Sequence, residues 1–385
     1  SSSVGAIGVL TTKYAFPRIA HPNWADRETS PEGISIFRLK GFPKKSIPLY
    51  SVPLVWFPPF QVKEYLEEFN PNVIHFVGDG WFWGHFWSWF WFRKKARFVF
   101  TPSYHTLPII RWWIRPINAF ICNVMDWVVS LTHQEADQVR KAYLVPKDRQ
   151  EIIGWGASPM SPKALPSNDN GTTPSSSDPL TILCVGRLGQ HKGQEWLLNI
   201  YRAALPQLQH PTQLVLVGRD EGDEANLRNL VRSADLDGQV IFTGELSDAE
   251  LADWYIRADA FALFSQYEAF GLVYFEAMIC GVPVLTHDVG ANQELLTQGA
   301  VVTPRFDEAA AVEALVNLVN DFDYRKELGE AAQTYALKEF TWSSVANKYL
   351  NIYQTASEER NNGSNRTGRW GTQDSTYQPA PRHCG

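Results

Sequence analysis

The chain has 385 residues, 44% hydrophobic and 20% charged, with a formal net charge of −6. This length predicts two domains, the composition is that of a globular protein, and the negative charge argues against nucleic acid as a partner. The four cysteines, Cys122, Cys184, Cys280 and Cys384, show no paired spacing. No apolar run reaches the roughly 18 residues of a membrane span, and no signal peptide is recognisable, so we expect a reduced, cytoplasmic protein.

Two histidines stand in or after predicted strands of the N-terminal half. His75 lies in PNVIHFVGDG, and His105 follows a strand predicted for residues 97–101 in FTPSYHTLP. The carboxyl ends of strands are where α/β folds bind ligands. Taken alone, each histidine is nevertheless more often structural than functional.

Residues 81–98 (WFWGHFWSWFWFRKKARF) are rich in Trp and Phe before they turn basic at Arg93, Lys94 and Lys95. A helix here would be aromatic on nearly every face. One interpretation is a buried helix of the first domain. The other is peripheral membrane contact through residues 81–97, with rings at headgroup level and cations facing anionic lipids. The sequence leaves both open.

Residues 125–139 predict a strand and then a helix, which Thr132 and Glu135 begin as a capping box. Residues 160–179 are rich in Pro, Ser, Asn and Gly and predict a linker. Strands alternate with helices on both sides of this linker, so the predicted fold class is α/β with parallel sheets.

The segment 181–193 (TILCVGRLGQHKG) carries the first binding motif. A buried strand runs into Arg187, and Lys192 opens a helix. The planar guanidinium and the compact ammonium on a glycine-rich turn suit a diphosphate. Basic residues at strand ends are often only solvated, so this spacing alone is modest evidence.

The most informative segment is 265–294 (SQYEAFGLVYFEAMICGVPVLTHDVGANQE). A loop carries Glu268, and a helix predicted for 272–279 carries Glu276. Gly271 would expose amide groups at the start of this helix, where the dipole favours a phosphate. The two carboxylates could accept hydrogen bonds from sugar and ribose hydroxyls. The segment therefore predicts a nucleotide-sugar site, although two surface carboxylates would be the alternative if the spacing stood alone.

Together these motifs resemble the retaining glycosyltransferases of family 4, which have the GT-B fold, over about residues 70–356. The resemblance implies an α/β fold of two Rossmann-like, doubly wound domains facing across a cleft. It implies an acceptor-binding domain at 1–158 and a nucleotide-sugar-binding domain at 159–339. The helix at 340–356 would pack back on the first domain, and 357–385 reads as a disordered tail.

The resemblance also assigns residue roles. Arg187 and Lys192 would hold the donor's diphosphate and stabilise its departure without a metal or another cofactor. Glu268 would contact the donor sugar and Glu276 the ribose, while His105 would face the donor sugar. We expect His105, Glu268, Arg187 and Lys192 to be catalytic.

Six further positions complete the expected nucleotide-sugar site. The backbone of the loop would contribute, as would the glycine that ends LVLVGRD (214–220) and the turn after the strand in 240–259. These positions are Phe270, Gly271, Leu272, Gly218, and the pair Glu245 and Leu246. The D-x-D sequence at 321–323 resembles that of metal-dependent transferases, but it lies in a helical run, so we expect surface charge and no metal site.

The resemblance predicts a hexosyltransferase that uses a nucleotide-diphosphate sugar, UDP-glucose by default and GDP-mannose as the alternative. The acceptor would be a glycan, a lipid-linked glycan or a glycolipid, in bacterial surface polysaccharide or glycolipid synthesis. A lipid-linked acceptor would explain 81–97 and place the protein on the cytoplasmic face of the inner membrane. The remaining alternatives are an inactive nucleotide-sugar-binding protein and a Rossmann oxidoreductase. The spacing of Gly78, Gly80 and Gly84 suggests the oxidoreductase, but bulky residues fill that turn.

Overall fold

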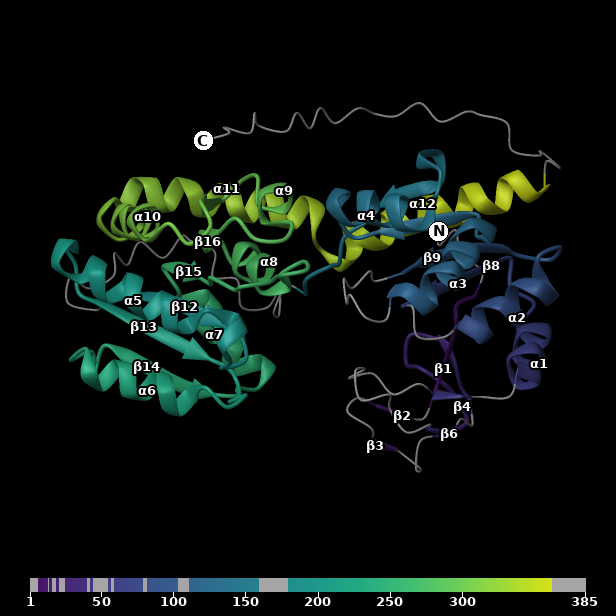
Figure 1. Ribbon diagram of the computed structural model, residues 1–385, viewed down its shortest axis with the longest axis horizontal. Helices are drawn as coiled ribbons and strands as arrows, with labels where there is room; N and C mark the ends of the chain where they lie inside the picture. The colour runs from purple at the N-terminus through teal and green to yellow at the C-terminus, as the bar shows by residue number, and fades with distance from the viewer. Residues whose placement is uncertain are drawn as a thin grey trace. The chain divides into compact units, whose positions relative to one another are not determined.

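The computed structural model describes residues 6–12, 14–15, 19–20, 25–39, 42–43, 55–56, 59–78, 82–102, 111–158 and 179–361. These residues form two compact units (Figure 1). The first unit holds the described residues up to Val129, then Gln138–Glu151, and those from Ile352 onward. The second unit holds Ser130–Asp137 and Ile152–Asn351.

The N-terminal part of the chain contains β1 (Gly8–Thr12), β2 (Tyr14–Ala15), β3 (Ile19–Ala20), β4 (Arg27–Thr29), β5 (Ser35–Leu39), β6 (Phe42–Pro43), β7 (Val55–Trp56), α1 (Pro59–Phe69), β8 (Val73–Val77), α2 (Phe82–Phe92), β9 (Arg97–Thr101), α3 (Arg111–Val124), β10 (Trp127–Ser130), α4 (His133–Tyr143), a short 3-10 turn (Lys147–Arg149) and β11 (Gln150–Ile152). One sheet has the order β11-β10-β9-β8, with β8, β9 and β10 parallel. A separate sheet has the order β1-β5-β4.

The C-terminal part contains β12 (Leu180–Val185), 3-10 turns at Gln190–Lys192 and Leu205–Gln207, α5 (Gln194–Ala204), β13 (Thr212–Val217), α6 (Glu224–Ser233), β14 (Val240–Gly244), α7 (Asp248–Arg257), β15 (Ala260–Ala262), α8 (Leu272–Ile279), β16 (Val284–His287), α9 (Asn292–Leu295), β17 (Ala300–Thr303), α10 (Glu308–Asn320), α11 (Phe322–Glu339) and α12 (Trp342–Asn361). Residues of α12 from Ile352 onward belong to the first unit.

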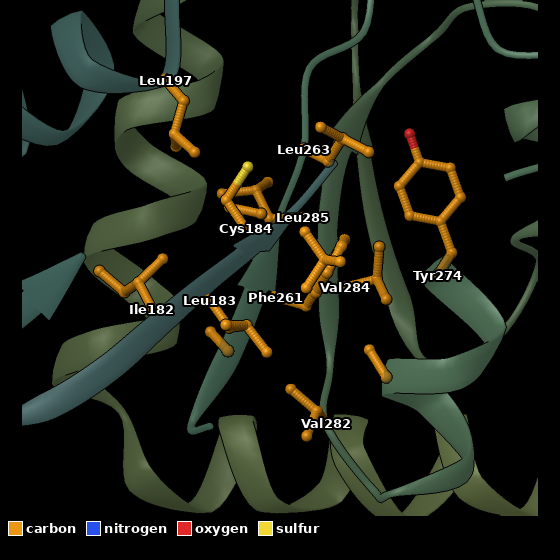
Figure 2. Packing of buried hydrophobic residues seen from close by; sticks show 14 of the residues in the cluster. Ile182, Leu183, Cys184, Leu197, Phe261, Leu263, Tyr274, Val282, Val284 and Leu285 are labelled. Atoms are coloured by element: carbon orange, nitrogen blue, oxygen red, sulfur yellow. The ribbon is translucent and has the colours of Figure 1, made fainter. Parts of the chain in front are cut away.

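The six strands of the second unit are parallel and ordered β14-β13-β12-β15-β16-β17. The chain therefore winds outward in one direction from β12 to β14 and in the other from β15 to β17, which is the doubly wound arrangement. Every residue of β12 after Leu180 is buried, as expected for a parallel strand covered on both faces. Figure 2 shows Ile182 and Cys184 of β12 in one buried cluster with Leu197 of α5, Phe261 of β15 and Tyr274 of α8. The α/β, doubly wound prediction is confirmed.

The predicted cap of α4 is present, and Asp321 of the D-x-D sequence also caps a helix. The Glu135 amide donates to Thr132 Oγ1 at 3.0 Å, and the Leu131 amide donates to Glu135 Oε2 at 2.6 Å. The carboxylate of Glu135 thus fixes the chain entering α4. In the D-x-D sequence, Asp321 Oδ1 accepts from the Tyr324 amide at 2.9 Å and caps α11. These carboxylates satisfy backbone donors at helix starts.

His75 has a structural position in the first unit. Its Nδ1 lies 2.7 Å from the Tyr353 hydroxyl of α12, and its Nε2 lies 2.9 Å from Thr101 Oγ1 of β9. Burial lowers the pKa of His75 from 6.5 to about 4. The neutral imidazole therefore links two strands of the sheet to the last helix.

This burial predicts a pH-dependent stability. Between pH 6.5 and about 4 the unfolded His75 binds a proton that the folded one does not, so the free energy of unfolding should fall as pH falls. A pKa shift of this size lowers the free energy of unfolding by about 3 kcal/mol once pH has fallen through the whole range. Urea unfolding across this range should show a shallower pH dependence in His75→Gln. The same change at exposed His210 should leave the slope unchanged. Equal slopes in all three proteins would contradict the assignment.

Candidate functional site

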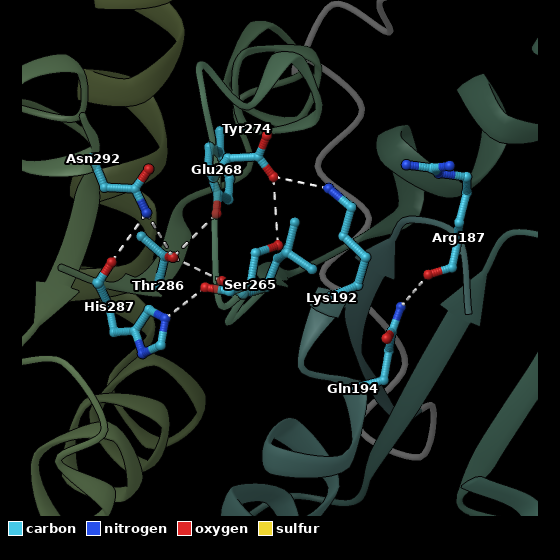
Figure 3. A network of polar contacts seen from close by, with 10 residues as sticks. Arg187, Lys192, Gln194, Ser265, Glu268, Tyr274, Thr286, His287 and Asn292 are labelled. Carbon is cyan, nitrogen blue, oxygen red and sulfur yellow. Dashed lines mark hydrogen bonds and ion pairs between the residues drawn. The ribbon is translucent and has the colours of Figure 1, made fainter. Parts of the chain in front are cut away.

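The switch in winding direction brings the two predicted binding motifs together. The strands β12 and β15 are neighbours, so the loops at their carboxyl ends meet at one edge of the sheet. Lys192 follows β12, and Glu268 follows β15. Lys192 Nζ lies 2.9 Å from Glu268 Oε2 (Figure 3), and the two side chains are only 17% and 14% exposed. This shielded ion pair joins two motifs that stand 76 residues apart in the sequence.

Two glycines allow the loops to approach this closely. Gly193, which precedes α5, has a φ of +69°, and a Cβ there would lie 2.0 Å from the carbonyl oxygen of Phe264. Gly290 has a φ of +58°, and a Cβ there would lie 2.0 Å from the carbonyl oxygen of Glu268. A side chain at either position would both clash with backbone and strain its own. The conformation of the Glu268 loop therefore depends on both glycines.

Arg187 stands at the outer side of the same turn. Its guanidinium is half exposed and lies 2.5 Å from the Glu221 carboxylate, while its carbonyl oxygen accepts a 2.9 Å hydrogen bond from Gln194 Nε2 (Figure 3). Gln194 is itself almost fully buried at the start of α5. The backbone of Arg187 is thus fixed from the interior while its charge faces solvent.

A buried polar network holds the Glu268 loop against the next strand (Figure 3). Thr286 Oγ1 donates to the carbonyl oxygen of Leu263 at 2.7 Å, and His287 Nε2 lies 2.9 Å from the carbonyl oxygen of Ser265. Asn292 Nδ2 donates to Thr286 Oγ1 at 3.2 Å and to the His287 carbonyl oxygen at 3.0 Å. Because these groups are buried and paired, the network gives the loop one defined position.

The loop ends at the start of α8. Gly271 is its N-cap, with a φ of +75°, and no side chain caps the helix there. The following residue, Leu272, is partly exposed, whereas the ring of Phe270 is buried against Phe275 at 5.2 Å. The helix thus presents free amide groups beside Glu268, an arrangement that favours an anion.

Glu276 lies on α8 and is not in contact with the ion pair. Its Oε2 accepts a 2.8 Å hydrogen bond from the hydroxyl of Tyr255, a fully buried residue of α7. Burial raises the pKa of Glu276, the hydrogen bond from Tyr255 lowers it, and the charge of Asp248 raises it. Tyr255 therefore both orients this carboxylate and favours its ionised form.

The other predicted residues are distributed along the same edge. Gly218 directly follows β13, and its backbone passes so close to the Gly186 carbonyl oxygen that a Cβ would lie 2.1 Å from it. Glu245 and Leu246 follow β14, one strand further out, with Glu245 exposed. His105 lies outside the described residues, and its role stays a prediction.

Sequence reasoning missed Tyr255 and Gln194. Both face site residues from helices, Tyr255 toward Glu276 and Gln194 toward the Arg187 backbone. The signal available was weak, since a Tyr or Gln within an amphipathic helix normally indicates packing alone. Among the described residues, no group of three or more His, Cys, Asp or Glu side chains could hold a metal ion.

Chemically, this edge of the sheet combines the two cations Arg187 and Lys192, free helix amides and several carboxylates, among them Glu268 and Glu276. Cations and amides suit a diphosphate, and carboxylates suit the hydroxyls of sugars. The arrangement is therefore suited to a ligand that is anionic in one part and a polyol in others.

Comparison with known families agrees with this reading. The sequence matches Glycosyl transferases group 1 over residues 168–335 and Glycosyltransferase Family 4 over residues 17–159. It is 35% identical over 182 residues to a phosphatidyl-myo-inositol mannosyltransferase of Mycobacterium leprae, covering 46% of each chain. It is 34% identical over 251 residues to a lipopolysaccharide core biosynthesis mannosyltransferase of Rhizobium meliloti, covering 62% of this chain and 66% of that one.

The matches cover 60%, 46% and 58% of the lengths of three curated relatives, so the chain spans about half to three fifths of these proteins. Among solved structures, a sucrose-phosphate synthase from Thermosynechococcus elongatus superposes with a TM-score of 0.64 at 23% identity, over 90% of this chain and 88% of that one. Anabaena HepE in complex with UDP superposes with a TM-score of 0.62 at 18% identity, over 77% and 82% of the two chains.

Two family matches that together run from residue 17 to residue 335 agree with the doubly wound sheet and with the site at its switch point. The chain therefore belongs to glycosyltransferase family 4 and has the GT-B fold.

Proposed function

We propose that the protein transfers a hexose from a nucleotide-diphosphate sugar to a hydroxyl group of a glycan, a lipid-linked glycan or a glycolipid. The observation that supports this most directly is the contact between Lys192 and Glu268 beside the uncapped start of α8. A cation and helix amides for the diphosphate stand there next to a carboxylate for the sugar.

In the proposed reaction, the bond between the sugar's anomeric carbon and the diphosphate oxygen breaks, and a bond to the acceptor oxygen forms. Arg187, Lys192 and the amides of α8 stabilise the charge that develops on the leaving diphosphate. Lys192 then exchanges part of its contact with Glu268 for phosphate, and Glu268 is left to accept from sugar hydroxyls. The departing phosphate takes the acceptor's proton on the same face, so the configuration is retained and no metal is required.

For the donor we propose a UDP-hexose such as UDP-glucose, and GDP-mannose as the second candidate. The similarity of the fold to HepE, solved with UDP, supports the first. The two mannosyltransferase relatives support the second. The relatives' names include a phosphatidylinositol and a lipopolysaccharide core, which supports a lipid-linked acceptor and a peripheral membrane contact through residues 81–97.

The function can be tested with a panel of nucleotide sugars. A true donor should raise the melting temperature, because a ligand of the folded state stabilises it by mass action. The same donor should release free nucleotide when an acceptor lipid extract is added, and EDTA should not reduce the rate. Stabilisation without nucleotide release would indicate a binding protein. Loss of activity in EDTA, restored by Mg²⁺ or Mn²⁺, would contradict the metal-independent mechanism.

Arg187→Ala and Lys192→Ala should each weaken the binding of UDP or GDP, whichever nucleotide the panel selects. A charge-assisted hydrogen bond contributes roughly 1.5–3 kcal/mol, so the affinity should fall about tenfold or more in each variant. Isothermal titration calorimetry measures this directly. Lys326→Ala, which removes an exposed cation of α11, is the matched control and should bind normally. Unchanged affinity in both site variants would show that the diphosphate is placed wrongly.

Glu276→Ala should weaken free-nucleotide binding, while Glu268→Ala should mainly lower turnover of the intact donor.

Nucleotide affinity should also fall as pH falls through the raised pKa of Glu276, since a protonated carboxyl loses acceptor capacity. Tyr255→Phe should move this fall to higher pH, because the lost hydrogen bond had lowered that pKa. Tyr335→Phe is the control, because it removes another hydroxyl hydrogen bond of the second unit, to the Leu295 carbonyl oxygen. An identical pH profile in Tyr255→Phe would rule out its positioning role.

A further inference from the structure

Three helices of the first unit expose large apolar side chains on one surface. Phe60 of α1 is 73% exposed, Phe90 of α2 is 42% exposed, and Ile117 and Phe120 of α3 are 43% and 46% exposed. The helix α2 contacts both α1 and α3 (Figure 1). We call this surface, formed by these four residues and the rings between them, the aromatic face.

The exposed residues are not scattered. Phe60 stacks on Trp91 with ring centroids 6.2 Å apart, and Trp91 stacks on Trp87 at 5.2 Å. Trp87 meets Phe90 at 5.8 Å. Phe86 then connects Phe90 to Phe120, at 6.2 Å and 6.1 Å. Single exposed apolar residues are normal on soluble proteins, but a continuous row of aromatic rings across three helices indicates an interaction surface.

The core of the first unit uses the other side of α2, so packing in the core does not explain why these rings are exposed. The helix α2 packs inward through His85, Ser88 and Phe92, which are all buried. His85 lies 4.3 Å from the ring of Phe76 and 5.2 Å from that of Phe100. The two sequence interpretations of 81–97 are therefore compatible, because one side of the helix belongs to the core and the other does not.

Cations lie beside the aromatic face. The Arg93 guanidinium lies 4.6 Å from the centre of the Phe90 ring, and Lys63 Nζ lies 5.9 Å from that of Trp91. Lys94 and Lys95 follow α2 and are exposed. Neither α2 nor α3 contains an acidic residue. On α1, Glu67 pairs with Lys63 at 3.5 Å.

The residue composition of the aromatic face favours a lipid surface over a protein partner. Protein interfaces are enriched in aromatic residues and Arg but depleted of Lys. Aromatic rings beside several lysines instead match the interfacial region of a bilayer, where rings lie at headgroup level and lysines attract anionic lipids. None of the described helices is long and apolar enough to cross a membrane.

We propose that the aromatic face binds the surface of a bilayer containing anionic phospholipid, with Phe60, Phe90, Ile117 and Phe120 entering the interface and Arg93, Lys94 and Lys95 contacting headgroups. It rests on the proposed function only in that a lipid-linked acceptor would be presented at such a surface. Lipid binding itself requires no donor and no turnover.

The test is co-sedimentation with vesicles of phosphatidylcholine alone or of equimolar phosphatidylcholine and phosphatidylglycerol. The protein should sediment with the second kind only, and less in high salt, because exposed charges are screened. Replacing Phe60, Phe90 and Phe120 together with Ser should abolish binding. Lys94→Gln with Lys95→Gln should reduce partitioning roughly thirtyfold, at about 1 kcal/mol for each lysine near the membrane.

Phe322→Ser is the matched control. Phe322 is 59% exposed in the second unit and has the Arg325 guanidinium 5.6 Å from its ring centre, so it reproduces the chemistry outside the aromatic face. It should sediment as the wild type does. The lysine variant changes charge only, so it tests the proposal even if the Phe variant folds poorly.

No sedimentation of the wild type with anionic vesicles, or equal sedimentation of the wild type and both variants, would overturn the proposal. Self-association that the Phe variant abolishes, without vesicle binding, would assign the face to a second copy of the chain and overturn it as well. Nucleotide binding, measured by calorimetry without lipid, reports separately on the proposed function. A failure there would leave the vesicle result intact.

Discussion

The shielded ion pair between Lys192 and Glu268 is the interaction on which the site depends. Each residue follows a different strand, and the pair forms only because β12 and β15 are neighbours at the switch point of the sheet. Two charges that are mostly removed from water require each other, since removing either leaves the other uncompensated. The pair thus constrains both loops. Because the Glu268 loop leads directly into α8, it also fixes the position of the uncapped start of that helix.

In such a site, each cation already contacts a carboxylate whose place a phosphate oxygen could take. The contact that Lys192 makes with Glu268 resembles the contact it would make with a phosphate oxygen, and the contact that Arg187 makes with Glu221 is comparable. Binding an anionic ligand then exchanges one charged partner for another at modest desolvation cost. The Glu268 backbone need not move, because the close approach of Gly290 and the network around Thr286 also hold this loop.

In the first unit, the notable feature is a surface and not a polar site. Its parallel strands and the neutral His75 between β8, β9 and α12 make an ordinary core, but α2 supplies more aromatic surface than that core covers. Excess apolar area is costly in water, so it persists where another phase or partner can cover it. Glycosyl transfer to a lipid-linked acceptor would give such a surface a purpose, because the acceptor and the covering phase would be the same membrane.

The sequence alone determined the parts that depend on local pattern. The apolar run of β12, the helix from Leu272 to Ile279, the cap at Thr132, and the glycine-punctuated motifs around Lys192 and Glu268 could all be recognised from residue types and spacing. The cap at Asp321 could not, because the sequence indicated only surface charge there. The family resemblance then predicted which of these residues form one site. Only the tertiary structure decided what each side chain contacts: that Glu268 pairs with Lys192, that Tyr255 orients Glu276, and which side of α2 is exposed. The physical reason is that strand order and helix packing join residues far apart in the chain. In a helix that is aromatic on nearly every face, the short side with His85 and Ser88 also gives too weak a periodicity to predict which side is buried.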